Sequence, residues 1–229
     1  MDTSIYKTFA DSHFGSFKDL SLLITAFTHR SYLNEHRKTA AEHNERLEFL
    51  GDAVLELVVT EFLYVNHKEP EGILTNWRSA LVRTESISAA ANEQGFEPLL
   101  RLSRGEKRGS ERAREQILAN CFEAVIGALY LDQGYQAAEK FIKKSLLPSL
   151  DGILHSGSWL DPKSQLQEMV QSRDGFTPVY KVLSEEGPDH DKTFVVGVFV
   201  DNKLRGEGTG ASKQSAQVAA AVTALKEYS

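Results

Sequence analysis

Cysteine is nearly absent from this sequence. The 229-residue chain contains one, Cys121, so no disulfide can form within it. Its neighbours Phe122 and Ala124 are apolar, which indicates a buried and unreactive thiol. A chain that cannot rely on internal disulfides fits a reducing cytosol.

Long apolar runs are also lacking. No stretch reaches the roughly eighteen apolar residues that a membrane span requires. Residues 1–15 do not contain a basic region followed by an apolar run, which is the pattern of a secretory signal. We therefore expect a cytoplasmic protein that is neither exported nor bound to a membrane.

The third shortage is one of positive charge, since the formal net charge is −6 at pH 7. This balance argues against a protein whose whole surface attracts nucleic acid. Any nucleic-acid site must then be a local patch. With 229 residues the chain can still form one large domain or two small ones, each with its own core.

The most informative stretch runs from Asn44 to Leu57 and reads NERLEFLGDAVLEL. Its apolar residues recur at helical spacing, and its acids Glu45, Glu48, Asp52 and Glu56 follow at steps of three, four and four. Such steps place the four carboxylates in one line along a helix. Like charges at this spacing repel, so the line costs stability unless something positive lies against it. A divalent cation is one candidate, and an ordinary solvated acidic face is the other.

A second helix is expected over residues 114–131, REQILANCFEAVIGALYL. Within this apolar stretch Asn120 and Glu123 stand three residues apart and share a face. Burying an unpaired carboxylate is expensive, so Glu123 must be paired, protonated, bound to a metal or placed at an edge. We favour a functional role over a structural ion pair, because acids in apolar surroundings tend to mark sites.

The pattern of elements changes along the chain. Before residue 150 it predicts helices alone, at residues 20–27, 44–65, 73–94, 114–131 and 137–147. A Gly- and Ser-rich segment over residues 151–160 reads as a linker. A helix, three strands and a last helix then follow, at residues 163–172, 178–183, 193–200, 204–207 and 213–228. We therefore expect a mainly α protein with a helical domain over 1–150 and a small α+β domain over 161–229, in the order α-β-β-β-α.

Two segments resemble motifs of the bacterial ribonuclease III family, in the family's order: NERLEFLGDAVLEL and ILANCFEAVIGALYLDQGY. The tail from Asp161 resembles a double-stranded RNA-binding domain. The resemblance covers essentially the whole chain. It implies an all-helical endonuclease domain that works as a homodimer, holds Mg²⁺ through carboxylates (with Mn²⁺ as a possible substitute) and cuts both strands of duplex RNA. It also implies 5′-phosphate and 3′-hydroxyl products, and a role in processing ribosomal RNA precursors and some messenger and transfer RNAs.

The resemblance also assigns roles to particular residues. Glu48, Asp52 and Glu123 match the family's carboxylates. Glu48 and Glu123 would bind the metal from facing helices, and Asp52 would be a further ligand or would position the attacking water. At Asn120 the family often carries Asp. The Asn oxygen can still coordinate a hard cation but brings no charge, so we expect weaker Mg²⁺ binding. The alternative is a duplex-RNA-binding protein whose turnover has been weakened through Asn120.

The charge of the tail does not indicate RNA binding, because residues 160–229 contain eight Lys and Arg against ten Asp and Glu. Duplex RNA is recognised mainly through its shape, its 2′-hydroxyls and its phosphates, so a few groups can suffice. By resemblance, Ser164, Gln167 and Glu168 would reach one minor groove and His190 the next. Lys213 would meet the phosphates between them.

Overall fold

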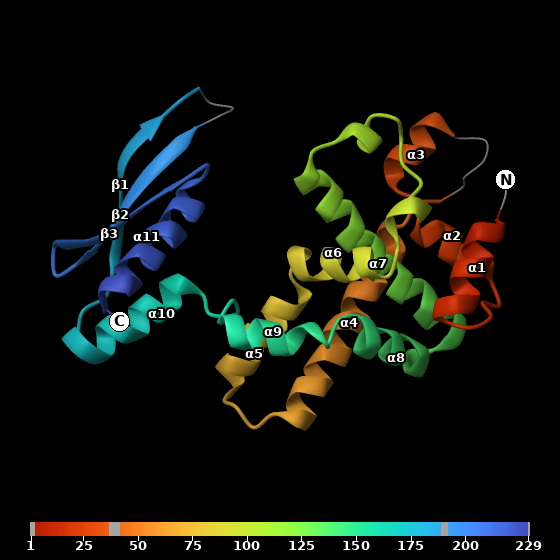
Figure 1. Ribbon diagram of the computed structural model, residues 1–229, viewed down its shortest axis with the longest axis horizontal. Helices are drawn as coiled ribbons and strands as arrows, with labels where there is room; N and C mark the ends of the chain where they lie inside the picture. The colour runs from red at the N-terminus through yellow and green to blue at the C-terminus, as the bar shows by residue number, and fades with distance from the viewer. Residues whose placement is uncertain (1–2, 37–41, 189–191, 229) are drawn as a thin grey trace. The chain divides into compact units, whose positions relative to one another are not determined.

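The computed structural model describes residues 3–36, 42–188 and 192–228. They form two compact units that divide between Trp159 and Leu160 (Figure 1). The first unit is helical and the second combines a sheet with two helices. In the part of the chain that is described, no helix is long and apolar enough to cross a bilayer. The predicted fold class, a mainly α chain with an all-helical domain followed by an α-β-β-β-α domain, is confirmed.

The first unit consists of nine described α-helices and two short 3₁₀ turns. They are α1 (Ser4–His13), α2 (Leu20–Ala26), α3 (Arg30–Glu35), α4 (Glu45–Asn66), α5 (Glu71–Val82), α6 (Thr84–Glu93), η1 (Glu97–Leu99), η2 (Glu106–Arg108), α7 (Glu111–Gln133), α8 (Tyr135–Ser145) and α9 (Ser149–Ser156). The long helices α4 and α7 lie at the centre of this unit, and α2, α6 and α8 also pack against α7 (Figure 1).

Two glycines let α4 and α7 approach each other closely. A Cβ placed on Gly51 of α4 would overlap the backbone oxygen of Glu123, and one on Gly127 of α7 would overlap the backbone oxygen of Leu47. The two backbones therefore touch where no side chain fits between them. This contact holds the acidic stretch of α4 directly beside Glu123, which lies on the facing stretch of α7.

The core around this crossing is apolar and rich in aromatic rings. Phe27, Phe96 and Phe122 have no solvent exposure. Phe9 packs edge-on against Phe27 and Phe96, with ring centroids 5.6 and 5.5 Å apart. Cys121 is fully buried in the same core, as its apolar neighbours indicated. The rigid core fixes α4 and α7 in place and with them the side chains that the two helices present.

The second unit is a three-stranded antiparallel sheet in the order β1-β2-β3 with two helices packed on it. Its elements are α10 (Pro162–Asp174), β1 (Val179–Glu186), β2 (Thr193–Val200), β3 (Lys203–Gly210) and α11 (Lys213–Tyr228). Val196, Val198 and Val200 of β2 are buried, as their alternation predicted. The turn after β2 contains Asp201 and Asn202 with φ of 49° and 59°, as a tight two-residue hairpin requires.

Three expectations about the helical unit differ from the structure. The linker expected over residues 151–160 is largely helical, because Leu150 and Ile153 are buried and α9 packs against α5. Their apolar spacing outweighs the Gly and Ser content. The single helix expected over 73–94 is two helices, since Arg83 is extended with ψ of 155° between α5 and α6. Helix α7 begins at Glu111 rather than 114, because Ser110 Oγ accepts a hydrogen bond from the backbone N–H of Ala113 at 3.3 Å.

Candidate active site

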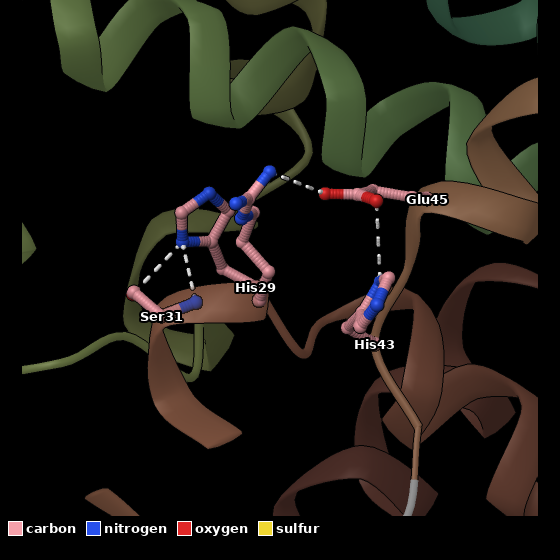
Figure 2. Close-up of polar contacts among 5 residues, drawn as sticks. His29, Ser31, His43 and Glu45 are labelled. Carbon is pink, nitrogen blue, oxygen red and sulfur yellow. Dashed lines mark hydrogen bonds and ion pairs between the residues drawn. The ribbon is translucent and has the colours of Figure 1, made fainter. Parts of the chain in front are cut away.

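The two ends of the acidic line on α4 lie beside basic side chains. Arg30 Nη1 lies 3.4 Å from Glu45 Oε1, and His43 Nδ1 lies 3.8 Å from Glu45 Oε2 (Figure 2). At the other end, Arg78 Nε lies 3.1 Å from Glu56 Oε2. Glu45 and Glu56 are therefore engaged in surface ion pairs. The acids in the middle of the line have no such ion pair.

That middle consists of Glu48 and Asp52. Among the residues that the structure describes, no Lys, Arg or His lies within 4.0 Å of an oxygen of Glu48, Asp52 or Glu123. Glu48 Oε2 is in addition buried without any hydrogen-bond partner. An unsatisfied carboxylate oxygen is costly in a protein interior, so this atom is poised to bind a ligand.

Glu123 faces these two acids from α7. Burial, followed by the charges of Asp52, Glu48 and Glu56, raises the pKa of Glu123 to about 8. The pKa of Glu48 is also raised, by burial and then by Glu45 and Asp52. Both shifts record an excess of negative charge between α4 and α7, which a bound cation would relieve.

Asn120 lies one turn before Glu123 and completes the cluster. Its side chain lies beside Glu48, and its Oδ1 accepts a hydrogen bond of 2.7 Å from Gln116 Nε2. The structure thus gathers the four side chains expected at the metal, Glu48, Asp52, Asn120 and Glu123. Within the described ranges, no group of three or more His, Cys, Asp or Glu side chains is placed so that it could hold a metal ion by itself. An open set of oxygens fits Mg²⁺, which keeps several of its waters.

The residues expected to contact RNA lie in the second unit. Ser164, Gln167 and Glu168 are exposed on α10, and Ser164 Oγ also donates a hydrogen bond of 2.8 Å to Asp161 at the helix N-cap. Lys213 is exposed as the first residue of α11. His190, expected at the next minor groove, falls outside the described residues.

Sequence reasoning missed two polar residues near these positions. Gln116 contacts Asn120, and its only signal was the four-residue spacing on one helix. Lys163 lies at the start of α10, where its Nζ donates a hydrogen bond of 2.7 Å to Gln217 Oε1 and lies 4.9 Å from the ring centre of Tyr180. Neither the contact between α10 and α11 nor that with β1 could be read from the sequence.

Large apolar side chains are exposed along α4 and at the end of α7. Phe49 is the most exposed, with 82% of its surface open to solvent. The others in this strip are Leu57, Tyr64, Val65 and Leu131. A strip of this kind on a protein surface marks an interaction site.

Comparison with known proteins decides the family. Residues 19–150 match the model described as Ribonuclease-III-like, and residues 162–228 match the double-stranded RNA binding motif. The chain belongs to the ribonuclease III family. Ribonuclease 3 of Enterococcus faecalis is 46% identical over 211 residues, which is 92% of this chain and 91% of that protein. Ribonuclease 3 of Oceanobacillus iheyensis is 46% identical over 217 residues, 94% of this chain and 95% of that protein.

A solved structure agrees with the sequence matches. The nuclease domain of ribonuclease III from Campylobacter jejuni is 37% identical, with a TM-score of 0.54, and covers 61% of this chain and 96% of that one. That structure is described as flexible in a region involved in dimer formation. Ribonuclease III enzymes are metal-dependent nucleases, and this member is an endoribonuclease of double-stranded RNA. The alternative of a binding protein with weakened turnover is not favoured.

Proposed function

We propose that this ribonuclease III cuts duplex RNA with Mg²⁺ held by Glu48 and Asp52 of α4 and Glu123 of α7, with Mn²⁺ as a substitute. The observation that carries the proposal is the buried, unpartnered Oε2 of Glu48 beside a Glu123 whose pKa is raised to about 8. A hard cation bound to such oxygens lowers the pKa of a coordinated water and neutralises charge on the scissile phosphate.

The protein's own groups prepare the site for this chemistry. Without a cation, Glu123 holds a proton near neutral pH because it is buried and because Asp52 and Glu48 face it. Asp52 lies one turn after Glu48, on the same face, where its carboxylate can accept a proton from a water and orient it toward the phosphate. The glycine contact between α4 and α7 keeps these carboxylates at a fixed separation.

The second unit is proposed to hold the duplex. Ser164, Gln167 and Glu168 would contact one minor groove, and His190 the next. Lys213 would contact the intervening phosphates at the N-terminus of α11, where backbone N–H groups also favour anions. Few charges take part, so this binding depends on shape more than on net charge.

The active form is proposed to be a homodimer. The strip of Phe49, Leu57, Tyr64, Val65 and Leu131 supports this, because it is an apolar surface that a second copy would cover. Phe49 precedes Asp52 by three residues, so the same segment of α4 serves the interface and the site. Two copies bring two sites to one duplex, one for each strand.

The products are proposed to carry 5′-phosphate and 3′-hydroxyl ends. The expected cellular work is cytoplasmic processing of ribosomal RNA precursors and of some messenger and transfer RNAs. Family membership and the matches along both units support this assignment.

The direct test is cleavage of a labelled RNA hairpin across a series of Mg²⁺ concentrations. Wild type should cut, and Glu123→Ala should retain the hairpin in a filter-binding assay without cutting it. Glu93→Ala, at an exposed position on α6, is the matched control and should cut normally. If neither wild type nor Glu93→Ala cuts at any Mg²⁺ or Mn²⁺ concentration, the proposed metal chemistry is wrong.

A further inference from the structure

The end of the first unit is fastened to that unit's own core. Trp159, its last residue, is partly buried, and its ring packs nearly perpendicular to the ring of Trp77 on α5, with centroids 5.8 Å apart. Trp77 is itself buried. One residue before Trp159, the backbone oxygen of Ser158 accepts a hydrogen bond of 3.2 Å from Arg83 Nη1, which comes from the residue that follows α5. The short stretch after α9 is therefore held against the helical unit.

The second unit begins with an equally defined geometry. Asp161 is the N-cap of α10, and its Oδ2 accepts hydrogen bonds from the backbone N–H and the Oγ of Ser164, at 3.0 and 2.8 Å. Pro162 follows as the first residue of the helix, and its ring restricts its own φ and favours an extended residue before it. One residue, Leu160, stands between Trp159 and this cap. Because each residue has only two soft backbone torsions, few rotations remain between the two fastened ends.

The contact of Trp159 with Trp77 thus sets the length of the free tether between the two units. Resting on the proposal above that the second unit holds the duplex, we propose that Trp159 is a positioning residue: it keeps the tether at one residue and thereby fixes where along a duplex the nuclease unit cuts. With the contact broken, the free chain would run from Gly157, where α9 ends, to Leu160. The three added residues would lengthen the reach by about 10 Å, at about 3.5 Å per residue.

The length of the tether affects both the affinity for substrate and the position of the cut. A short tether raises the effective concentration of the held duplex at the acidic cluster, and this concentration falls as the tether lengthens. A longer tether therefore raises KM. It leaves kcat near the wild-type value, because the carboxylates on α4 and α7 are unchanged. It also admits more positions of the duplex over these acids, so the cuts spread over neighbouring base pairs.

The contact itself is tested without RNA. Nitrogen-15 relaxation of the full-length protein gives the order parameter of the Ser158 backbone N–H, which is about 0.85 in a rigid backbone and below about 0.6 in a flexible one. Wild type and Trp159→Phe should lie near the rigid value, and Trp159→Ala near the flexible one. A flexible Ser158 in wild type, or a rigid one in Trp159→Ala, would overturn the proposal.

The role in cutting is tested with an end-labelled RNA duplex in Mg²⁺. Trp159→Ala should raise KM several-fold, leave kcat within about twofold and spread the cuts over more positions, and Trp159→Phe should restore all three properties. Inserting Gly-Ser-Gly between Leu160 and Asp161 lengthens the tether while the contact with Trp77 stays intact, and it should reproduce the changes of Trp159→Ala. His155→Ala, at an exposed position on α9, is the matched control and should behave like wild type.

Two results would overturn the role of the tether. One is a Trp159→Ala protein with the KM and the cut positions of wild type. The other is a change of KM in Trp159→Ala that the insertion does not reproduce, because the effect would then not come from tether length. If wild type cuts no duplex, the proposed function and this role fall together, and the order parameters distinguish that result from a segment that was never held.

Discussion

Replacing Glu123 with Gln should stabilise the metal-free protein at neutral pH. The pKa of Glu123 is raised from 4.5 to about 8, chiefly by burial and the nearby acids. The contribution of Glu123 to the stability of the folded state is therefore fully present below pH 4.5 and is lost as the pH rises through 8. At pH 7 the unfolded chain has already released this proton while most of the folded chain still holds it. The neutral amide of Gln has no proton to release in either state, so the variant avoids this loss.

The magnitude follows from the same pKa. The 2.5 units between the ordinary pKa of 4.5 and pH 7 correspond to at most about 3.5 kcal/mol, at about 1.4 kcal/mol per pH unit. Glu123 is only partly buried, so screening by water reduces the expected gain for Glu123→Gln to about 2 kcal/mol. Below pH 4.5 the two proteins should be equally stable, because both side chains are then neutral.

The assay is urea unfolding of the full chain without divalent cations, followed by tryptophan fluorescence. The chain has two tryptophans, Trp77 and Trp159, and both lie in the first unit, so the signal reports on the domain that contains Glu123. Glu93→Gln, at an exposed position, is the control and should change little. Saturating Mg²⁺ should reverse the order, since wild type then gains about 2.7 kcal/mol at a hundred times the dissociation constant. A Glu123→Gln protein that is less stable than wild type at pH 7 without metal would refute the reasoning.

The remaining predictions concern packing, assembly and RNA affinity. Gly51→Ala should cost at least about 2 kcal/mol in urea unfolding, because the added Cβ overlaps the backbone of Glu123; a cost within about 0.5 kcal/mol would show that the helices separate freely. Phe49→Asp should shift the protein from dimer to monomer in sedimentation velocity, and a variant that sediments like a wild-type dimer would remove this strip from the interface. Lys213→Ala should weaken hairpin binding several-fold and reduce the slope of log affinity against log salt by about one; an unchanged slope would show that Lys213 contacts no phosphate.

Local patterns predicted the elements that carry the site. The spacing of Glu45, Glu48, Asp52 and Glu56 placed the acids in one line, and the alternation in β2 predicted that strand with its bounds Thr193–Val200. Such patterns need only residues a few positions apart, which is why sequence alone recovers them. The resemblance to ribonuclease III then supplied the roles, and the comparisons confirmed the family.

What the sequence could not predict depends on contacts between distant segments. Nothing near Glu56 in sequence shows that Arg78 of the next helix will neutralise it, or that Arg30 will pair with Glu45. The need for glycine at Gly51 and Gly127 appears only when α4 and α7 are brought together. Because these contacts leave Glu48 and Asp52 as the uncompensated acids, they define the site more sharply than the motif does.

The central claim is that a divalent cation binds between Glu48, Asp52 and Glu123. The measurement that tests it most directly is anomalous diffraction from crystals of the full chain soaked in Mn²⁺. We predict a peak within coordination distance of carboxylate oxygens from both α4 and α7, and no such peak in crystals of Glu123→Ala. A wild-type map without a peak between these helices, or with its strongest peak elsewhere on the protein, would contradict the account.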